Sequence, residues 1–228
     1  MQRRESGSVL IYVFLGISLF AALSYVITRN QDASTEGLGD DRISIQVDRL
    51  INYTNQLRGV LAQMRIGGID LDEVNFVQRD DDFQNPTGTD FATSPHFAKV
   101  FHPGGGGLGE IDLSADYNDT GAVDPAQLAI QFGTNVEWTP SSNSDAIASF
   151  INLSLDMCTA LNDKIYGSGA ISPNPPVTSI NPQNVFVNTT SGSNDDFVAS
   201  DCSECDGRVA LCIQDNTSYT FYSIVGAR

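Results

Sequence analysis

Residues 3–30 of the chain read RRESGSVLIYVFLGISLFAALSYVITRN. Three charged residues precede Gly7, and the segment Val9–Ile27 then runs for 19 residues without a charge. A helix needs about 20 apolar residues to cross the hydrocarbon core of a membrane. The run therefore predicts a transmembrane helix over residues 8–28, and the two leading arginines predict a cytoplasmic N-terminus.

Three interpretations of this run are open at the level of the residues. A cleaved signal peptide would end at the small residues of Ala22-Leu23-Ser24. An uncleaved signal anchor would keep the whole run and tether the rest of the chain. In the third interpretation, a short leader is removed and the retained run becomes a contact surface between subunits, where small residues allow close helix packing. Those small residues are Gly16, Ser18, Ala21, Ala22 and Ser24.

The third interpretation rests on a resemblance. ESG at residues 5–7, followed by SVLIYVFLGISLFAALSYVI at residues 8–27, resembles the leader and first helix of type IV pilin-like proteins, including the pseudopilins of type II secretion. The resemblance implies that a prepilin peptidase cuts after Gly7 and that Ser8 becomes a methylated N-terminus. It also implies a structural subunit that packs its helix against other pilin-like subunits at the tip, or during assembly, of a type IV pilus or a type II secretion filament.

The same resemblance implies a place in the cell. The chain would be a single-pass protein of the bacterial inner membrane, with its body in the periplasm or in an extracellular filament. Two residues depart from the family pattern: Ser8 replaces the usual phenylalanine, and Tyr12 replaces a glutamate that pairs with the neighbouring subunit's N-terminal amine. An unpaired charge is costly in an apolar environment. Tyr12 therefore argues against a major filament subunit, and it leaves open a minor, tip-like or priming subunit as well as a relative that does not polymerise.

The polar segment at residues 29–41 predicts a break after the first helix. It holds Gly37 and Gly39, and each glycine costs a helix about 1 kcal/mol relative to alanine. A second helical pattern follows from residue 42 to about Arg65, and Gly67-Gly68 predicts its end. Its apolar side chains recur at steps of three and four residues. They are Val47, Leu50, Ile51, Thr54, Leu57, Leu61 and Met64.

The remainder reads as short strands and one further helix. The helix is predicted over Ser144–Tyr166, with Ser144 as its N-cap and Gly167 as its stop. Strands are predicted at residues 72–80, 97–103, 184–190, 207–214 and 218–226, and residues 128–138 read as a helix end with a strand or as two strands. The expected fold is α+β: a long N-terminal helix, first transmembrane and then amphipathic, packed on a small antiparallel β-rich domain with a second helix. The expected divisions are a leader at 1–7, a transmembrane helix at 8–28, a linker at 29–41 and an exported domain at 42–228.

Charge and composition exclude some functions. Twelve basic residues stand against 28 acidic ones, for a net charge of −16, and such a surface repels nucleic acid. The sequence HPGGGGLGE at residues 102–110 lacks the Lys-Ser/Thr ending of a phosphate-binding loop and reads as a flexible surface turn. His96 and His102 are the only histidines, and no serine or cysteine stands in a nucleophile motif, so we predict that the chain is not an enzyme.

The sequence DYNDTGAVDPAQ at residues 116–127 resembles part of a calcium loop. Candidate oxygen ligands are Asp116, Asn118, Thr120 and Asp124. Gln127 takes the place of the usual bidentate glutamate, and a plain turn is the alternative interpretation. Calcium is the single cofactor suggested by the residues. It supports an alternative function, a monomeric, membrane-tethered periplasmic module that binds a ligand.

Four cysteines, Cys158, Cys202, Cys205 and Cys212, all lie in the second half of the chain. In an oxidising compartment they predict two disulfides. A structural zinc site would need a second closely spaced pair, which the sequence lacks. We expect Cys158 to pair with one of the three C-terminal cysteines.

Overall fold

A computed structural model describes residues 7–77, 94–113, 117, 125–187, 194–215 and 218–227. Before residue 41, the side chains that it describes are those of residues 12–21 and 24. The chain divides into two compact units, Met1–Ser44 and Ile45–Arg228. We call the second unit the body.

The first element is a helix, α1 (Gly7–Ile66), that is 60 residues long and shared by both units. The break predicted at residues 29–41 is absent from its backbone. Two glycines raise the cost of a helix, but an established helix gains a hydrogen bond with each added residue and propagates through such positions. The helix ends as predicted, with Gly67 donating to Gln63 O and Ile69 to Met64 O around Gly68, which has a φ of +88°.

No helix within the described residues combines the length and apolarity that a membrane span requires. The predicted transmembrane helix at 8–28 is wrong on this finding, and so are the fold class that included it and the single-pass inner-membrane location. The prediction rested on 19 residues without charge. Absence of charge is a weaker condition than about 20 apolar residues, and the side chains described between residues 12 and 24 include Gly16 and two serines. The body itself is a small α+β domain.

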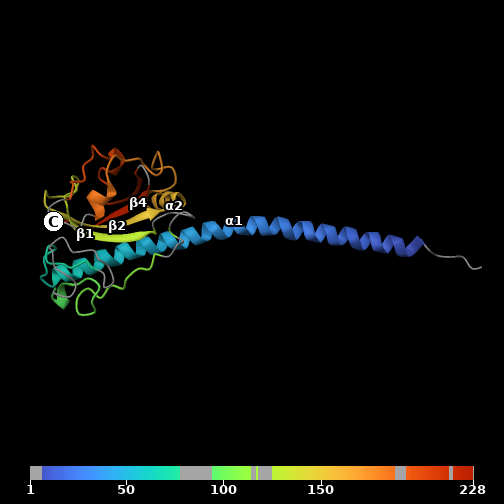
Figure 1. Ribbon diagram of the computed structural model, residues 1–228, viewed down its shortest axis with the longest axis horizontal. Coiled ribbons are helices and arrows are strands. Elements are labelled where there is room, and N and C mark those ends of the chain that lie inside the picture. Colours follow the sequence, from blue (N-terminus) through green and yellow to red (C-terminus); the bar gives the residue numbers. More distant parts are fainter. Residues whose placement is uncertain are drawn as a thin grey trace, which may run out of the picture. The chain divides into compact units, whose positions relative to one another are not determined.

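The body is built on one antiparallel sheet of four strands in the order β1-β2-β4-β3 (Figure 1). The strands are β1 (Gln127–Thr134), β2 (Asp145–Leu153), β3 (Ala210–Gln214) and β4 (Tyr219–Gly226). β3 and β4 confirm the two predicted C-terminal strands. They pair as neighbours, with Cys212 opposite Phe221, and Asp215 donates its backbone N–H to Ser218 O in the turn.

The helix predicted over Ser144–Tyr166 is half wrong. Its first part is β2, and the helix α2 (Leu155–Tyr166) begins after Ser154, whose hydroxyl accepts the N–H of Met157. Eight of the nine residues of β2 are buried, because the strand is covered on both faces. A strand covered on both faces has no alternation of polar and apolar residues, so its sequence resembles a buried helix.

Three predicted strands are not strands in the described part of the chain. Residues 72–77 and 97–103 contribute a single parallel bridge between Asn75 and Lys99, beside the short 3₁₀ helix η1 (His96–Ala98). Residues 184–187 belong to a π-helical turn, η3 (Gln183–Val187). The remainders of the predicted segments, 78–80 and 188–190, lie outside the described residues.

The two faces of the sheet are covered differently. The C-terminal half of α1 lies against one face, where Tyr53 meets Phe150 edge-on and Arg58 donates to Ile224 O at 3.1 Å and to Ser223 Oγ at 2.8 Å. Six of the seven predicted apolar-face residues of this half are buried. The other face carries a core cluster supplied largely by the connections between α2 and β3. This cluster includes Ile171, Ile180, Val185, Phe186, Phe197, Cys202 and Cys205.

Candidate functional site

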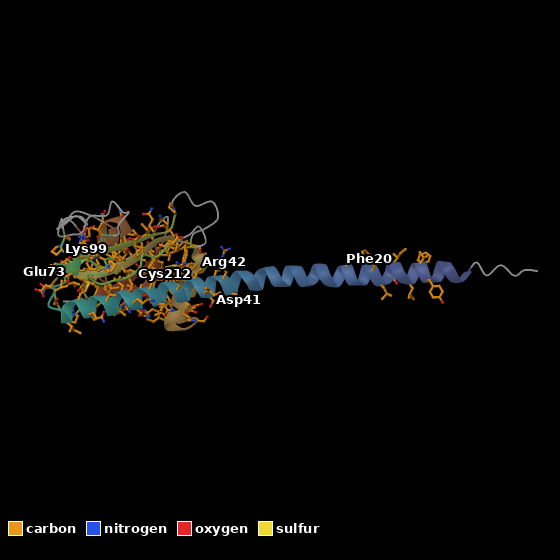
Figure 2. The ribbon with its side chains drawn as sticks, turned by 90° about the horizontal axis from the view of Figure 1, so that it is seen from below. Phe20, Asp41, Arg42, Glu73, Lys99 and Cys212 are labelled. Carbon is orange, nitrogen blue, oxygen red and sulfur yellow. A yellow bond between two sulfur atoms is a disulfide. The ribbon has the colours of Figure 1, made fainter. Side chains whose placement is uncertain are left out.

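The N-terminal part of α1 exposes apolar side chains on every side. Between residues 12 and 20, seven large apolar side chains are 55–73% exposed. They are Tyr12, Val13, Phe14, Leu15, Ile17, Leu19 and Phe20. Four consecutive residues pass once around a helix of 3.6 residues per turn, so residues 12–15 alone face all directions. Figure 2 shows the side chains around Phe20 projecting from the helix on both sides. We call residues 12–21 the apolar collar.

The predicted processing site lies directly before the apolar collar. Gly7 is the first residue of α1 and Ser8 the second, so both are described in their backbone. Tyr12 is part of the collar itself and is 71% exposed. Over its described residues the collar contains no Asp, Glu, Lys, Arg or His.

A second candidate site is a groove of about 630 Å³ on the body, bounded by α1 and by residues 109–111. We call it the α1 groove. Its volume falls in the range of about 300–1,000 Å³ that is usual for small-molecule pockets. It is lined by Ile45, Asp48, Arg49, Asn52, Tyr53, Gln56, Gly109, Glu110 and Ile111.

Helical spacing explains how α1 lines this groove. Residues four apart lie one above the other on a helix, with Cβ atoms about 5–6 Å apart. The lining residues of α1 therefore form two adjacent rows, one of Ile45, Arg49 and Tyr53 and the other of Asp48, Asn52 and Gln56. The second row is polar throughout, and it ends in two carboxamides that both donate and accept hydrogen bonds.

The glycine loop places the opposite side of the groove. A Cβ on Gly105 would come within 2.3 Å of Lys99 O, and a Cβ on Gly106 within 2.5 Å of Val60 Cγ1 on α1. These glycines let the chain pack directly against η1 and α1 before it continues as residues 109–111. The prediction of a flexible surface turn at residues 102–110 misses this packing role, because the sequence does not show what lies next to the glycines.

Tyr53 is the most unusual side chain in the α1 groove. It is 7% exposed, and its hydroxyl is buried without a hydrogen-bond partner. Burial raises the pKa of the Tyr53 phenol, and the charge of Glu110 raises the pKa further. The hydroxyl therefore stays protonated at neutral pH and lies within the field of the carboxylate on the opposite side. At the edge of the groove Asp48 pairs with Lys164 of α2 at 3.0 Å.

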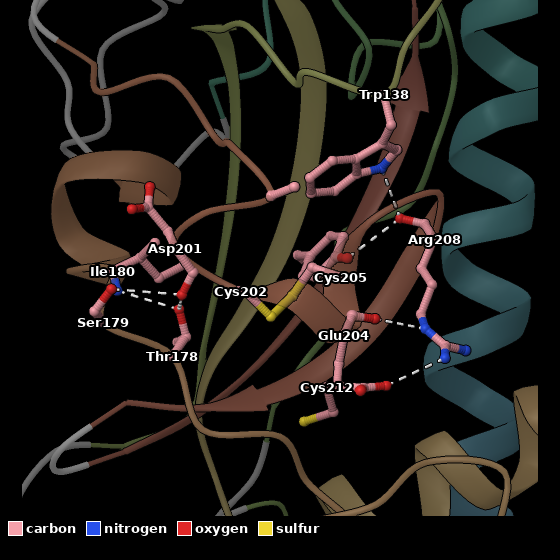
Figure 3. Close-up of a disulfide and its surroundings, with 12 residues drawn as sticks. Trp138, Thr178, Ser179, Ile180, Asp201, Cys202, Glu204, Cys205, Arg208 and Cys212 are labelled. Atoms are coloured by element: carbon pink, nitrogen blue, oxygen red, sulfur yellow. Dashed lines mark hydrogen bonds and ion pairs between the residues drawn. A yellow bond between two sulfur atoms is a disulfide. The ribbon is translucent and has the colours of Figure 1, made fainter.

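The cysteines form two disulfides, as predicted. Cys158 of α2 is joined to Cys212 of β3, and Cys202 is joined to Cys205 at the short 3₁₀ helix η4 (Ser203–Cys205). Figure 3 shows Arg208 beside the second bridge, where its guanidinium contacts Glu204 and its carbonyl accepts from the Trp138 indole at 3.0 Å. All four cysteines are at most 3% exposed, so both bridges belong to the core.

The predicted metal ligands cannot be placed. Asp116, Asn118, Thr120 and Asp124 lie outside the described residues. Within the described ranges, no three His, Cys, Asp or Glu side chains are grouped closely enough to hold a metal ion. The two histidines do meet, stacking at 4.0 Å between ring centroids, and Gly104 donates its N–H to Nδ1 of His102.

Comparison with known proteins adds no relative. No protein-family model, curated protein or solved structure matches this chain. Any function proposed for the chain must therefore be argued from the exposed side chains of the collar and from the residues that line the groove. The sequence alone did not single out Tyr53 or Glu110, because Tyr53 belongs to no motif and Glu110 is one of 28 acidic residues. The available signal was the polar row at 48, 52 and 56, which follows helical spacing.

Proposed function

We propose that this chain is a structural subunit that assembles with pilin-like subunits, including copies of itself, through the apolar collar of α1. The observation that carries the proposal is the exposure of seven large apolar side chains on all sides of one helical segment. Burying such side chains is worth about 25 cal/mol per Å² of apolar surface. A helix that is apolar all round is stable when it is surrounded, and helices of neighbouring subunits provide that cover.

The division of the chain supports this role. The collar belongs to the compact unit Met1–Ser44, whereas the sheet, α2 and both disulfides belong to Ile45–Arg228. The body has its own core, to which the collar contributes no residue. The leader-like sequence before Ser8 supports the pilin-like form of the proposal, in which a prepilin peptidase removes residues 1–7.

Tyr12 favours a minor subunit at the tip or start of a pilus or secretion filament. A subunit without the family's glutamate has no side-chain charge with which to neutralise a neighbour's amine. The aromatic ring of Tyr12, which is 71% exposed, still contributes apolar contact area to the interface between subunits. The subunit would then join the assembly by apolar packing alone.

The experiment is a comparison of assembly size by analytical ultracentrifugation, combined with the mass of the mature N-terminus. We expect the full chain to form assemblies of several copies. The double variant Val13→Glu, Leu15→Glu should be monomeric with an unchanged melting temperature, because neither residue belongs to the body. A processed chain should begin at Ser8 with one added methyl group. A monomeric full chain, or a mature chain that begins beyond the collar, would contradict the proposal.

A further inference from the structure

The α1 groove carries a second inference, which is independent of the assembly proposed above. All of its lining residues belong to the body. We propose that the α1 groove is a binding site for a neutral, hydroxyl-rich ligand, a saccharide unit. Among the described residues, the Tyr53 hydroxyl is buried, protonated and without a hydrogen-bond partner.

A buried donor without a partner destabilises the folded chain, because folding removes its hydrogen bonds to water and replaces them with nothing. Buried polar groups are paired in nearly all native structures, and an exception requires an explanation. Here the exception lines a groove of ligand size. A ligand atom that accepts a hydrogen bond from this hydroxyl would complete the pairing.

The charges around the groove decide which kind of acceptor fits. An anion would meet the carboxylate of Glu110 in a chain whose net charge is −16, and the carboxylate of Asp48 is already paired with Lys164. A protonated amine cannot accept a hydrogen bond from the phenol, and it would also meet the guanidinium of Arg49. Both kinds of charged ligand are therefore disfavoured.

A ligand hydroxyl suits this pair of neighbours. Through one oxygen atom it can accept from a phenol such as Tyr53 and donate to a carboxylate such as Glu110. A peptide bond separates its donor from its acceptor and directs them oppositely, so it satisfies this pair less well. The carboxamides of Asn52 and Gln56, one helical turn apart, both donate and accept and so match further hydroxyls along the same ligand.

The Tyr53 hydroxyl is covered in the free groove. Two of the residues that line the groove, Arg49 and Gln56, are exposed and have long, flexible side chains, and Arg49 donates to the Tyr117 hydroxyl at 3.4 Å. On this proposal a ligand reaches the phenol by displacing lining side chains of this kind.

The test is a titration of the full chain, in a zwitterionic detergent without sugar groups, followed by saturation-transfer NMR and calorimetry. The probes are the neutral disaccharides maltose, cellobiose and N,N′-diacetylchitobiose. Anionic maltobionate, cationic glucosamine and the neutral peptide N-acetyl-Ala-Ala-amide serve as comparisons. We expect at least one neutral disaccharide to bind at millimolar concentration or below, more tightly than every comparison compound.

The variant Tyr53→Phe separates binding from folding. Removal of an unpaired hydroxyl should leave the melting temperature equal or higher, while the affinity for the disaccharide should fall about tenfold. The control Gln63→Ala removes an exposed carboxamide of α1 that does not line the groove, and its affinity should be unchanged. Absence of binding by all three disaccharides, preference for the peptide or a charged probe, equal binding by Tyr53→Phe, or a lower melting temperature of that variant would overturn the proposal. None of these outcomes depends on whether the collar assembles.

Discussion

The two ends of α1 share one helical backbone but differ in whether their apolar side chains are buried or exposed. At residues 47–64 the apolar side chains form one stripe, and that stripe is buried against the body's sheet. At residues 12–21 the apolar side chains surround the helix and are exposed. A one-sided stripe is what an element needs to join its own domain, whereas an apolar surface on all sides needs partners from other molecules. The contrast separates the residues that stabilise the fold from those available for assembly.

The largest expected effect concerns the disulfides, which should act on the body alone. Replacing Cys158 and Cys212 by alanine removes a bridge across 54 residues and should lower the free energy of unfolding by about 4 kcal/mol in the chain-entropy model. Replacing Cys202 and Cys205, which are three residues apart, should cost about 2 kcal/mol. Chemical denaturation of both double variants checks the order. A larger loss for the short bridge would contradict the entropic account.

The next effect compares equivalent leucines at the two ends of α1. Leu57 is fully buried and Leu15 is 57% exposed. Leu57→Ala should lower the free energy of unfolding by about 3 kcal/mol through the cavity it leaves. Leu15→Ala should change it by less than about 0.5 kcal/mol but weaken assembly. Urea unfolding followed by circular dichroism measures the free energy of unfolding of both variants. Equal losses of free energy in the two variants would contradict the distinction between a buried and an exposed end of α1.

Two glycines, Gly106 and Gly16, allow the same comparison between the packed body and the exposed end of α1. A Cβ at Gly106 would lie 2.5 Å from Val60 Cγ1 and 2.6 Å from Val100 O, whereas a Cβ at Gly16 meets no atom within 4 Å. Gly106→Ala should therefore cost about 2 kcal/mol of stability through overpacking. Gly16→Ala should be neutral or stabilise α1, because alanine is the better helix former. Thermal melts of the two variants decide the matter, and an unaffected Gly106→Ala would show that the loop is not tightly packed.

The smallest effect is a dependence on pH in the glycine loop. Loss of solvent around the ring, followed by the charges of His96 and Lys99, lowers the pKa of His102 from its ordinary value of 6.5. The folded state thus favours the neutral ring, whose Nδ1 accepts the Gly104 N–H at 2.9 Å. This contribution to stability is present above pH 6.5 and is lost as the pH falls through the lowered pKa.

An NMR titration checks this loop directly. The His102 ring should titrate below pH 6.5, and the Gly104 amide should exchange faster as it does so. The collar, which has no charged side chain in its described part, should show no change over the same range. A His102 midpoint above 6.5 would contradict the assignment.

Local sequence patterns predicted the one-sided stripe from Val47 to Met64, the stop at Gly67-Gly68 and the two C-terminal strands. β2 was mistaken for helix because it is buried on both faces, and the predicted membrane span was inferred from absence of charge. The α1 groove could not be predicted, since it depends on the contact between α1 and a loop more than fifty residues away. Periodicity describes one element at a time and says little about what packs against it.

Crosslinking tests whether the apolar collar contacts the same segment of neighbouring copies. All four native cysteines are in disulfides, so the variant Ile17→Cys introduces one free thiol in the collar. Gln63→Cys places a matched exposed thiol on the body's part of α1. If the collars of neighbouring copies are in contact, mild oxidation should give covalent dimers of the Ile17→Cys chain and none of the Gln63→Cys chain. Equal crosslinking at the two positions, or none at residue 17, would contradict it.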